Sequence, residues 1–173
     1  MATRTHTRLE ARVYARSATW VANELVHVFI EIIRLRGLEM DHIIEKTEVI
    51  MNGLRTWLVT QKLDAAYLEV FDRDTDALVE RYDLHMNYSA PGGNTDERFE
   101  TRKELLESEL TRLQALHPGC AYRVAVTLKP DAVAVPGWGP TTLRDTSALR
   151  RRDIGRIIDT ARINVNLGAW LRD

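Results

Sequence analysis

The chain has 173 residues, of which 45% are hydrophobic, and its 24 Lys and Arg against 25 Asp and Glu leave a formal net charge of -1. Charges this evenly balanced provide no global basic field for nucleic acid or an anionic membrane, and no apolar run is long enough to cross a bilayer. The single cysteine, Cys120, excludes an intramolecular disulfide and a multi-cysteine zinc site. Together with the lack of a signal-like segment at the start, it predicts a cytoplasmic protein of one domain.

The first 60 residues predict a lead-in and two helices. Residues 1–10 begin with small, polar and basic side chains that have nothing to bury, so we expect a flexible N-terminus. Apolar residues at helical spacing predict a helix from about Ala11 to Leu35, which Gly37 ends. A second helix is predicted from Asp41, as its N-cap, to about Thr60. Gly53 lowers helix propensity in the middle of this helix, and we expect it to mark a close contact with another element.

A hairpin follows the two helices. Apolar and polar residues alternate over residues 66–71 and 78–88, and the acidic stretch 72–76 between them predicts the turn. The second of these strands has one apolar face and one polar face, which includes Arg81 and Asp83. We therefore expect a sheet with one face covered and the other in water.

A third helix and a third strand complete the regular part of the sequence. Apolar spacing predicts the helix over about residues 96–116, and alternation predicts the strand from Ala121 to Leu128. The order helix, helix, hairpin, helix, strand is typical of an α+β fold. It predicts a three-stranded antiparallel core sheet covered by about three helices.

The remaining residues, 131–173, have a different character. Three prolines and two glycines fall within residues 130–140, so no central strand or helix is expected to run through those eleven residues; they are Pro130, Pro136, Gly137, Gly139 and Pro140. Apolar side chains such as Trp138 and Leu143 are nevertheless spaced along the same stretch. We expect irregular backbone that is packed onto the rest of the protein.

The sequence offers no converging set of catalytic or metal-binding residues. Its five histidines lack metal-ligand spacing, no glycine-rich phosphate loop is complete, and no serine lies in a nucleophile elbow. Asp72, Asp74 and Asp76 resemble the start of a calcium loop, but the glycine and closing glutamate are missing. The arginines at 150–152 are interpreted as a solvated surface. We therefore expect no enzyme activity, no cofactor and no metal.

The last predicted strand would lie at an edge of the sheet and carries a single charge. Its residues are Ala121, Tyr122, Arg123, Val124, Ala125, Val126, Thr127 and Leu128. An exposed edge of this kind pairs readily with another strand unless it is covered. Two interpretations remain open. Either the C-terminal residues of the chain cover the edge, or a partner peptide pairs there by β-augmentation and the tail folds over it.

The chain resembles the HORMA domain family, in particular its bacterial branch in cyclic-oligonucleotide-based antiphage signalling (CBASS) systems. The resemblance is carried by the sequences LRTWL at 54–58, LEVFDRDTDALVERYDLHMNY at 68–88 and YRVAVTLKP to PGW at 122–138. It implies a fixed core over 11–130 and a mobile C-terminal safety belt over 131–173. The belt would close over a closure-motif peptide paired with the 121–128 strand, with Trp138 and Leu143 as anchors. Its later part would then pair along Leu78–Tyr88.

The same resemblance implies a set of partners. The peptide-bound protein would bind and activate a cGAS-like nucleotidyltransferase, and an AAA+ ATPase would reset it by pulling on the N-terminus, with Arg4 and Arg8 in the handle. A second HORMA protein is a further possible partner, as the source of the closure motif. Two alternatives stay open: a structural or assembly protein with a permanently closed belt, and a donor that presents its own segment 162–172.

Overall fold

The computed structural model describes residues 2–90 and 97–172 and contains one antiparallel sheet with helices on one face. The helices are α1 (Ala2–Leu35), α2 (Asp41–Val59) and α3 (Lys103–Leu110). The strands are β1 (Leu63–Asp72), β2 (Leu78–Tyr88), β3 (Phe99–Thr101), β4 (Cys120–Leu128), β5 (Arg150–Thr160) and β6 (Ile163–Leu171). The α+β class is confirmed.

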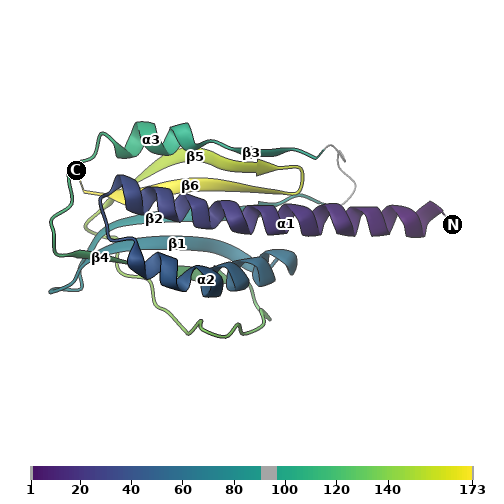
Figure 1. Ribbon diagram of the computed structural model, residues 1–173, viewed down its shortest axis with the longest axis horizontal. Coiled ribbons are helices and arrows are strands. Elements are labelled where there is room, and N and C mark those ends of the chain that lie inside the picture. Colours follow the sequence, from purple (N-terminus) through teal and green to yellow (C-terminus); the bar gives the residue numbers. More distant parts are fainter. Residues whose placement is uncertain (1, 91–96, 173) are drawn as a thin grey trace.

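The six strands lie in the order β3-β5-β6-β2-β1-β4 (Figure 1). The predicted three-stranded unit is present as β2-β1-β4, but the expected strand number was wrong for the sheet as a whole. The C-terminal hairpin β5–β6 adds to β2, and the short β3 adds to β5. As a result β3 and β4 form the two edges of the sheet.

The main core fills the space between the sheet and helices α1 and α2. Alternate residues of each strand point to this side, since successive side chains of a strand point to opposite faces. Its largest fully buried side chains include Phe29, Trp57 and Tyr82. A buried ion pair closes one end of this core: Arg36, just after α1, donates from Nη2 to Glu80 Oε1 at 2.6 Å.

Helix α1 begins at Ala2, nine residues before the predicted start. Residues 2–10 belong to the helix, ahead of its predicted start, and residue 1 lies outside the described residues. The flexibility predicted for residues 1–10 stays a prediction. No proline or glycine precedes Gly37, so nothing in the sequence stops the helix from extending. The extra turns project past the end of the sheet (Figure 1), so α1 is longer than burial requires.

The predicted third helix was too long at both ends. Residues 99–101 form β3, where Phe99 packs against Trp20 with ring centroids 5.2 Å apart. Helix α3 then covers only residues 103–110, and its buried side chains are Leu106 and Leu110. Phe99, which lies within the predicted helix, is thus a strand residue and pairs with Thr160 of β5.

Two smaller expectations also need correction. Met40, not Asp41, is the N-cap of α2, and no side chain caps that helix by a hydrogen bond. The polar face of β2 is only partly in water: Arg81 and Asp83 are 8% and 3% exposed, whereas Asn87 is exposed. Trp170 of β6 covers them, and its Nε1 donates to Asp83 Oδ2 at 2.7 Å.

Candidate functional site

Strand β4 presents an unpaired outer edge. Among the described strands it pairs with β1 alone, from Leu63 opposite Leu128 to Asp72 opposite Cys120. Next to its two ends, Lys129 N donates to Lys62 O, and Gly119 O accepts from Arg73 N. The backbone groups that face β1 therefore belong to odd-numbered residues. Backbone groups of alternate strand residues point the same way.

This alternation identifies the groups on the outer edge. The N–H and C=O groups of Tyr122, Val124 and Val126 face away from β1. Within residues 2–90 and 97–172, none of these backbone groups has a hydrogen-bond partner. The predicted edge strand therefore has three residues in position to form a ladder with an added strand.

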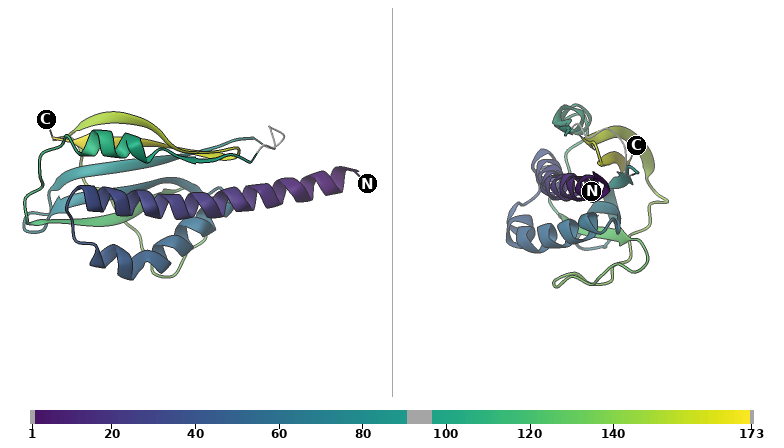
Figure 2. Two further views of the ribbon diagram at one scale, coloured as in Figure 1. Left: turned by 45° about the horizontal axis from the view of Figure 1, so that its top comes forward. Right: turned by 90° about the vertical axis from the view of Figure 1, so that its right-hand side faces the viewer.

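Residues 129–149, which connect β4 to β5, pass around this edge without pairing with it. We call this segment the belt loop. Figure 2 shows it in the right-hand view as a loop below the β4 side of the sheet. It starts on the helical side, where Val135 is buried and Trp57 Nε1 donates to Val133 O at 2.8 Å. It ends on the opposite side of the sheet, and so encloses the β4 edge.

Trp138 fixes the belt loop to helix α2. Its Nε1 donates to Val49 O at 2.9 Å, and its ring lies edge-on to Trp57 with centroids 5.1 Å apart. Gly53 makes this contact possible, because a Cβ there would lie 2.3 Å from Trp138 Nε1. The expectation that Gly53 marks a close contact is confirmed. Gly137 is also constrained: its φ is +86°, and a Cβ there would lie 2.6 Å from Val49 Cγ1.

Leu143 and Arg144 fix the belt loop to the opposite face of the sheet. Leu143 packs against a small cluster formed by Ala65, Tyr67 and Ala125. These three residues alternate with the core-facing residues of β1 and β4, so they lie on the face away from the helices. The two predicted anchor residues therefore lie on opposite sides of the same edge.

Glu69 is the centre of the polar contacts on this face. It is fully buried and accepts from Arg123 Nε at 2.7 Å, from Arg144 Nη1 at 3.0 Å and from Arg144 backbone N at 2.8 Å. Arg144 also hydrogen bonds to Asp76, and its guanidinium lies 3.8 Å from the centre of the Phe71 ring. The hydrogen bond from Arg144 holds the pKa of Asp76 below its ordinary value.

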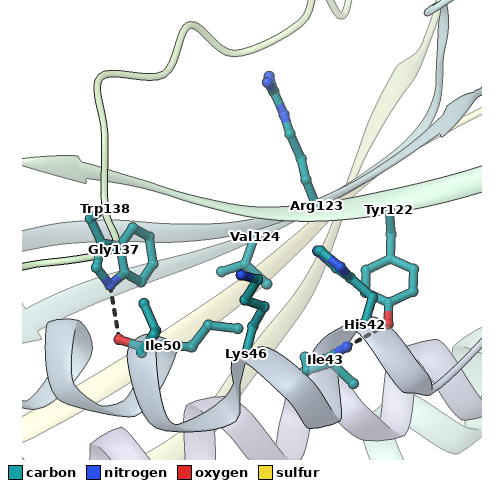
Figure 3. Close-up of a pocket in the computed structure, with 10 residues that line it drawn as sticks. His42, Ile43, Lys46, Ile50, Tyr122, Arg123, Val124, Gly137 and Trp138 are labelled. Carbon is teal, nitrogen blue, oxygen red and sulfur yellow. Dashed lines mark hydrogen bonds between the residues drawn. The ribbon is translucent and has the colours of Figure 1, made fainter.

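A cavity of about 190 Å³ lies beside the β4 edge on the helical side. Figure 3 shows it between α2, β4 and the belt loop. Its inner surface is apolar, with Ile43, Ile50 and Val124, and Trp138 closes one end. Tyr122 borders the other end, where its hydroxyl accepts from Ile43 N and donates to Glu39 O. The free backbone edge and the cavity thus adjoin each other.

The N-terminal residues of interest lie away from this site. Arg4 and Arg8 belong to the first turns of α1, in the part that projects past the sheet (Figure 1), and Arg8 is exposed. Nothing brings them near β4. Their role as a handle stays a prediction.

No metal centre is formed by the described residues. Over residues 2–90 and 97–172, no three His, Cys, Asp or Glu side chains are grouped to hold an ion. Cys120 is buried, and burial raises the pKa of its thiol, which makes it a poor nucleophile. Each helix in the same ranges is too short or too polar to cross a membrane.

Sequence reasoning missed Glu69, Arg144 and Lys46. A signal for Glu69 was present, since a single carboxylate in the middle of the apolar run AAYLEVF is a charge that needs a buried partner. Its partner Arg144 had no such signal, because it lies in irregular backbone 75 residues away. Lys46 looked like an ordinary exposed helix residue.

The sequence matches the family described as Bacterial HORMA domain 2 over residues 6–173. No curated protein has a matching sequence. Many solved structures resemble the fold, and three of them are described here. A chain of the mitotic checkpoint complex has a TM-score of 0.75 at 13% identity, with 91% of this chain and 99% of that chain covered.

C. elegans HTP-2 bound to the HIM-3 closure motif has a TM-score of 0.67 at 14% identity, covering 88% of this chain and 90% of that one. A chain of the E. coli MS115-1 CdnC:HORMA-deltaN complex has a TM-score of 0.58 at 10% identity, covering 92% and 89%. At such low identities these similarities describe the fold alone.

Proposed function

The chain belongs to the bacterial HORMA domain 2 family, and from that premise we propose that it is a non-enzymatic switch that captures a closure-motif peptide. The peptide adds as a strand to the outer edge of β4, at residues 121–128, and the belt loop encloses it. The core over 11–130 stays fixed, and the belt over 131–173 rearranges. In the peptide-bound form the protein binds and activates a cGAS-like nucleotidyltransferase of an antiphage signalling system.

One observation supports this proposal above all: the β4 edge is bare, yet the chain passes around it. Three residues of β4 point unpaired backbone groups outward, and the belt loop is fixed on both sides of that edge by Trp138 and Leu143. A strand inserted between β4 and the belt loop would gain ladder hydrogen bonds and be enclosed. HTP-2, which shares this fold, is bound to a closure motif.

The partner enzyme is proposed from the same family context. A structure with the same fold comes from a complex of CdnC with HORMA-deltaN. The sequence contains no complete catalytic motif, so we assign the chemistry to the partner nucleotidyltransferase. The AAA+ ATPase that resets the switch would engage the projecting start of α1, where Arg4 and Arg8 lie.

The pairing of the C-terminal hairpin favours a receiver of the closure motif over a donor. Strand β6 pairs with β2 from Trp170 opposite Arg81 to Ile163 opposite Tyr88. Segment 162–172 is thus occupied within its own sheet, along the strand expected for a closed belt. The alternative of a permanently closed assembly protein draws support from the buried contacts of Arg144 with Glu69.

A proline in β4 tests peptide capture directly. Val126→Pro removes an N–H that faces outward, so the ladder with β1 keeps its bonds while an added strand loses one and meets the proline ring. Peptides would be selected from a phage-displayed random dodecapeptide library on the immobilised chain, and their affinities measured by fluorescence anisotropy. We expect Val126→Pro to weaken binding at least tenfold, and Val126→Ala, the matched control, to retain it.

Peptides that bind both variants equally, or a library that yields none, would contradict capture at β4. A second experiment distinguishes the proposed switch from a permanently closed assembly protein. A selected peptide should raise product formation by the cGAS-like nucleotidyltransferase proposed as the partner when both proteins are mixed. For a permanently closed assembly protein, the peptide should change nothing.

A further inference from the structure

The cavity beside β4 has two chemically different ends. Figure 3 shows Trp138 and Ile50 at one end, Val124 and Lys46 in the middle, and Tyr122 with His42 at the other. The Trp138 end is apolar. The other end is polar, with the exposed imidazole of His42 at its mouth, and the exposed Lys46 lies between the two ends.

Lys46 is the charged group that a bound strand would meet. Figure 3 shows its side chain extending from α2 toward Val124 of β4. Among the described residues, its ammonium has no hydrogen-bond or ion-pair partner. Arg123 also borders the cavity, but its guanidinium is held on the far face by Glu69 and by the carbonyl of Thr142. Lys46 is thus the uncommitted cation at this edge.

The carboxylates of the protein limit where this positive field acts. Glu39 and Asp41 lie near the Tyr122 hydroxyl, beyond the His42 end of the cavity. An acidic side chain of a ligand would be repelled there. Opposite Lys46, nearer Val124, it would meet an unpaired ammonium instead.

The volume of the cavity defines the apolar partner. At about 190 Å³ it is larger than the apolar cavity of about 150 Å³ that holds benzene. A branched aliphatic or aromatic side chain therefore fits between Ile50, Val124 and Trp138. Alternate residues of a strand point to the same face, roughly 7 Å apart, so two neighbouring helix-facing residues would reach the apolar end and Lys46.

We infer that the captured peptide carries a large apolar residue at the Trp138 end and an Asp or Glu two residues away, opposite Lys46. This inference rests on the proposed capture of a peptide at β4 and adds its recognition chemistry. Strand β4 runs from the His42 end toward the Trp138 end. An antiparallel peptide therefore has the order apolar-x-acidic, and a parallel one the order acidic-x-apolar.

Selection on charge variants tests the acidic position. The random dodecapeptide library would be selected in parallel on the wild type, on Lys46→Glu and on Lys103→Glu, an exposed charge reversal on α3 that serves as the control. We expect the wild type and Lys103→Glu to enrich the apolar and acidic pair. Lys46→Glu should enrich a basic residue in place of the acidic one, and should bind the wild-type peptides about tenfold more weakly.

A second variant tests the apolar position. Val124→Phe fills the cavity from the strand side with a residue of high strand propensity, and its folding is checked by thermal unfolding. It should shift the selected apolar residue to alanine or glycine. If the large residue stays, the assignment of the cavity is wrong.

The remaining outcomes separate the inference from the proposed function. Peptides that need the Val126 N–H but lack an acidic residue, or keep it on Lys46→Glu, would overturn the inference and leave capture at β4 standing. If every selected peptide binds Val126→Pro as tightly as the wild type, capture itself has failed.

Discussion

Gly53 is the residue at which helix α2 and the belt loop come closest. The space that a Cβ would need is taken by the indole of Trp138, 2.3 Å away, and by Trp57, 2.9 Å away. In an ordinary exposed helix, glycine costs about 1 kcal/mol relative to alanine. The contact with Trp138 explains why a residue with this cost occupies the middle of α2.

Gly53→Ala should therefore destabilise the protein, although alanine is the better helix former. We expect a loss of roughly 1–3 kcal/mol in the free energy of unfolding, because the added methyl group overpacks against Trp138. Denaturant unfolding measures this loss, and faster proteolysis at residues 137–139 would report the displaced belt loop. The control is Asn52→Ala, on the exposed side of α2. A gain of about 1 kcal/mol in Gly53→Ala would contradict the contact.

Glu69 is the second residue that holds the belt loop, and its loss should be costly. Glu69→Gln removes the buried carboxylate from Arg144, whose side chain is 14% exposed, and leaves Asp76 as its remaining carboxylate partner. We expect a destabilisation of about 2–3 kcal/mol, somewhat less than for a fully buried pair. Hydrogen exchange should also speed up over residues 142–146.

The control for Glu69→Gln is Glu109→Gln, which removes a pair with Arg152 whose side chains are 30% and 54% exposed. This change should cost under about 1 kcal/mol. Equal effects of the two substitutions would show that the buried cluster does not hold the belt.

At the scale of elements, the contact between the belt loop and the turn that joins β1 to β2 makes the stability of the protein depend on pH. Asp76 lies in this turn, and the hydrogen bond from Arg144 lowers its pKa from an ordinary value of 3.8. A lowered carboxyl pKa stabilises the folded state at pH values above 3.8, and this gain is lost as the pH falls through the lowered value.

The difference in unfolding free energy between the wild type and Asp76→Asn should accordingly be largest near neutral pH and disappear well below pH 3.8. Urea unfolding across this range measures it. Asp74→Asn, in the same turn but without a bond to Arg144, should show no such trend. A constant difference at all pH values would mean that Asp76 acts by packing alone.

Elements with clean alternation or helical spacing could be predicted from the sequence, and those that depend on a distant partner could not. Strand β2 has the predicted bounds, and β4 begins one residue early. Strand β5 was missed because it begins with three arginines, and its pairing with β6 determines its conformation. β3 has only three residues, and pairing with β5 overrides the helical spacing of Phe99.

The candidate site was predictable in part for the same reason. The position of β4 at an edge follows from the order of elements. Trp138 could be singled out because it is an aromatic residue in a stretch interrupted by proline and glycine. The cavity does not, because it needs α2, β4 and the belt loop to meet at Ile43, Ile50 and Trp138. Such a meeting is a property of the tertiary structure, which spacing along the chain does not encode.

At the scale of the whole molecule, the C-terminal part of the chain connects the two sides of the three-stranded unit. It leaves β4 on the helical side, passes around the β4 edge, and returns to pair with β2 as β6. The buried pair of Arg36 with Glu80 ties the end of α1 to β2, and Arg36 also donates to the carbonyl of Gln114. The helical layer and the strand that receives the hairpin are thereby held together, independently of the belt loop.

The path of the belt loop has a kinetic consequence. A strand captured at β4 as proposed would be surrounded by one continuous stretch of backbone that is fixed at Trp138 on one side and at Arg144 on the other. Such a ligand leaves only when one fastening opens or when it slides out lengthwise. The rate at which the protein opens would then limit how fast the ligand dissociates, so the ligand would stay bound longer than its contacts with β4 alone would allow.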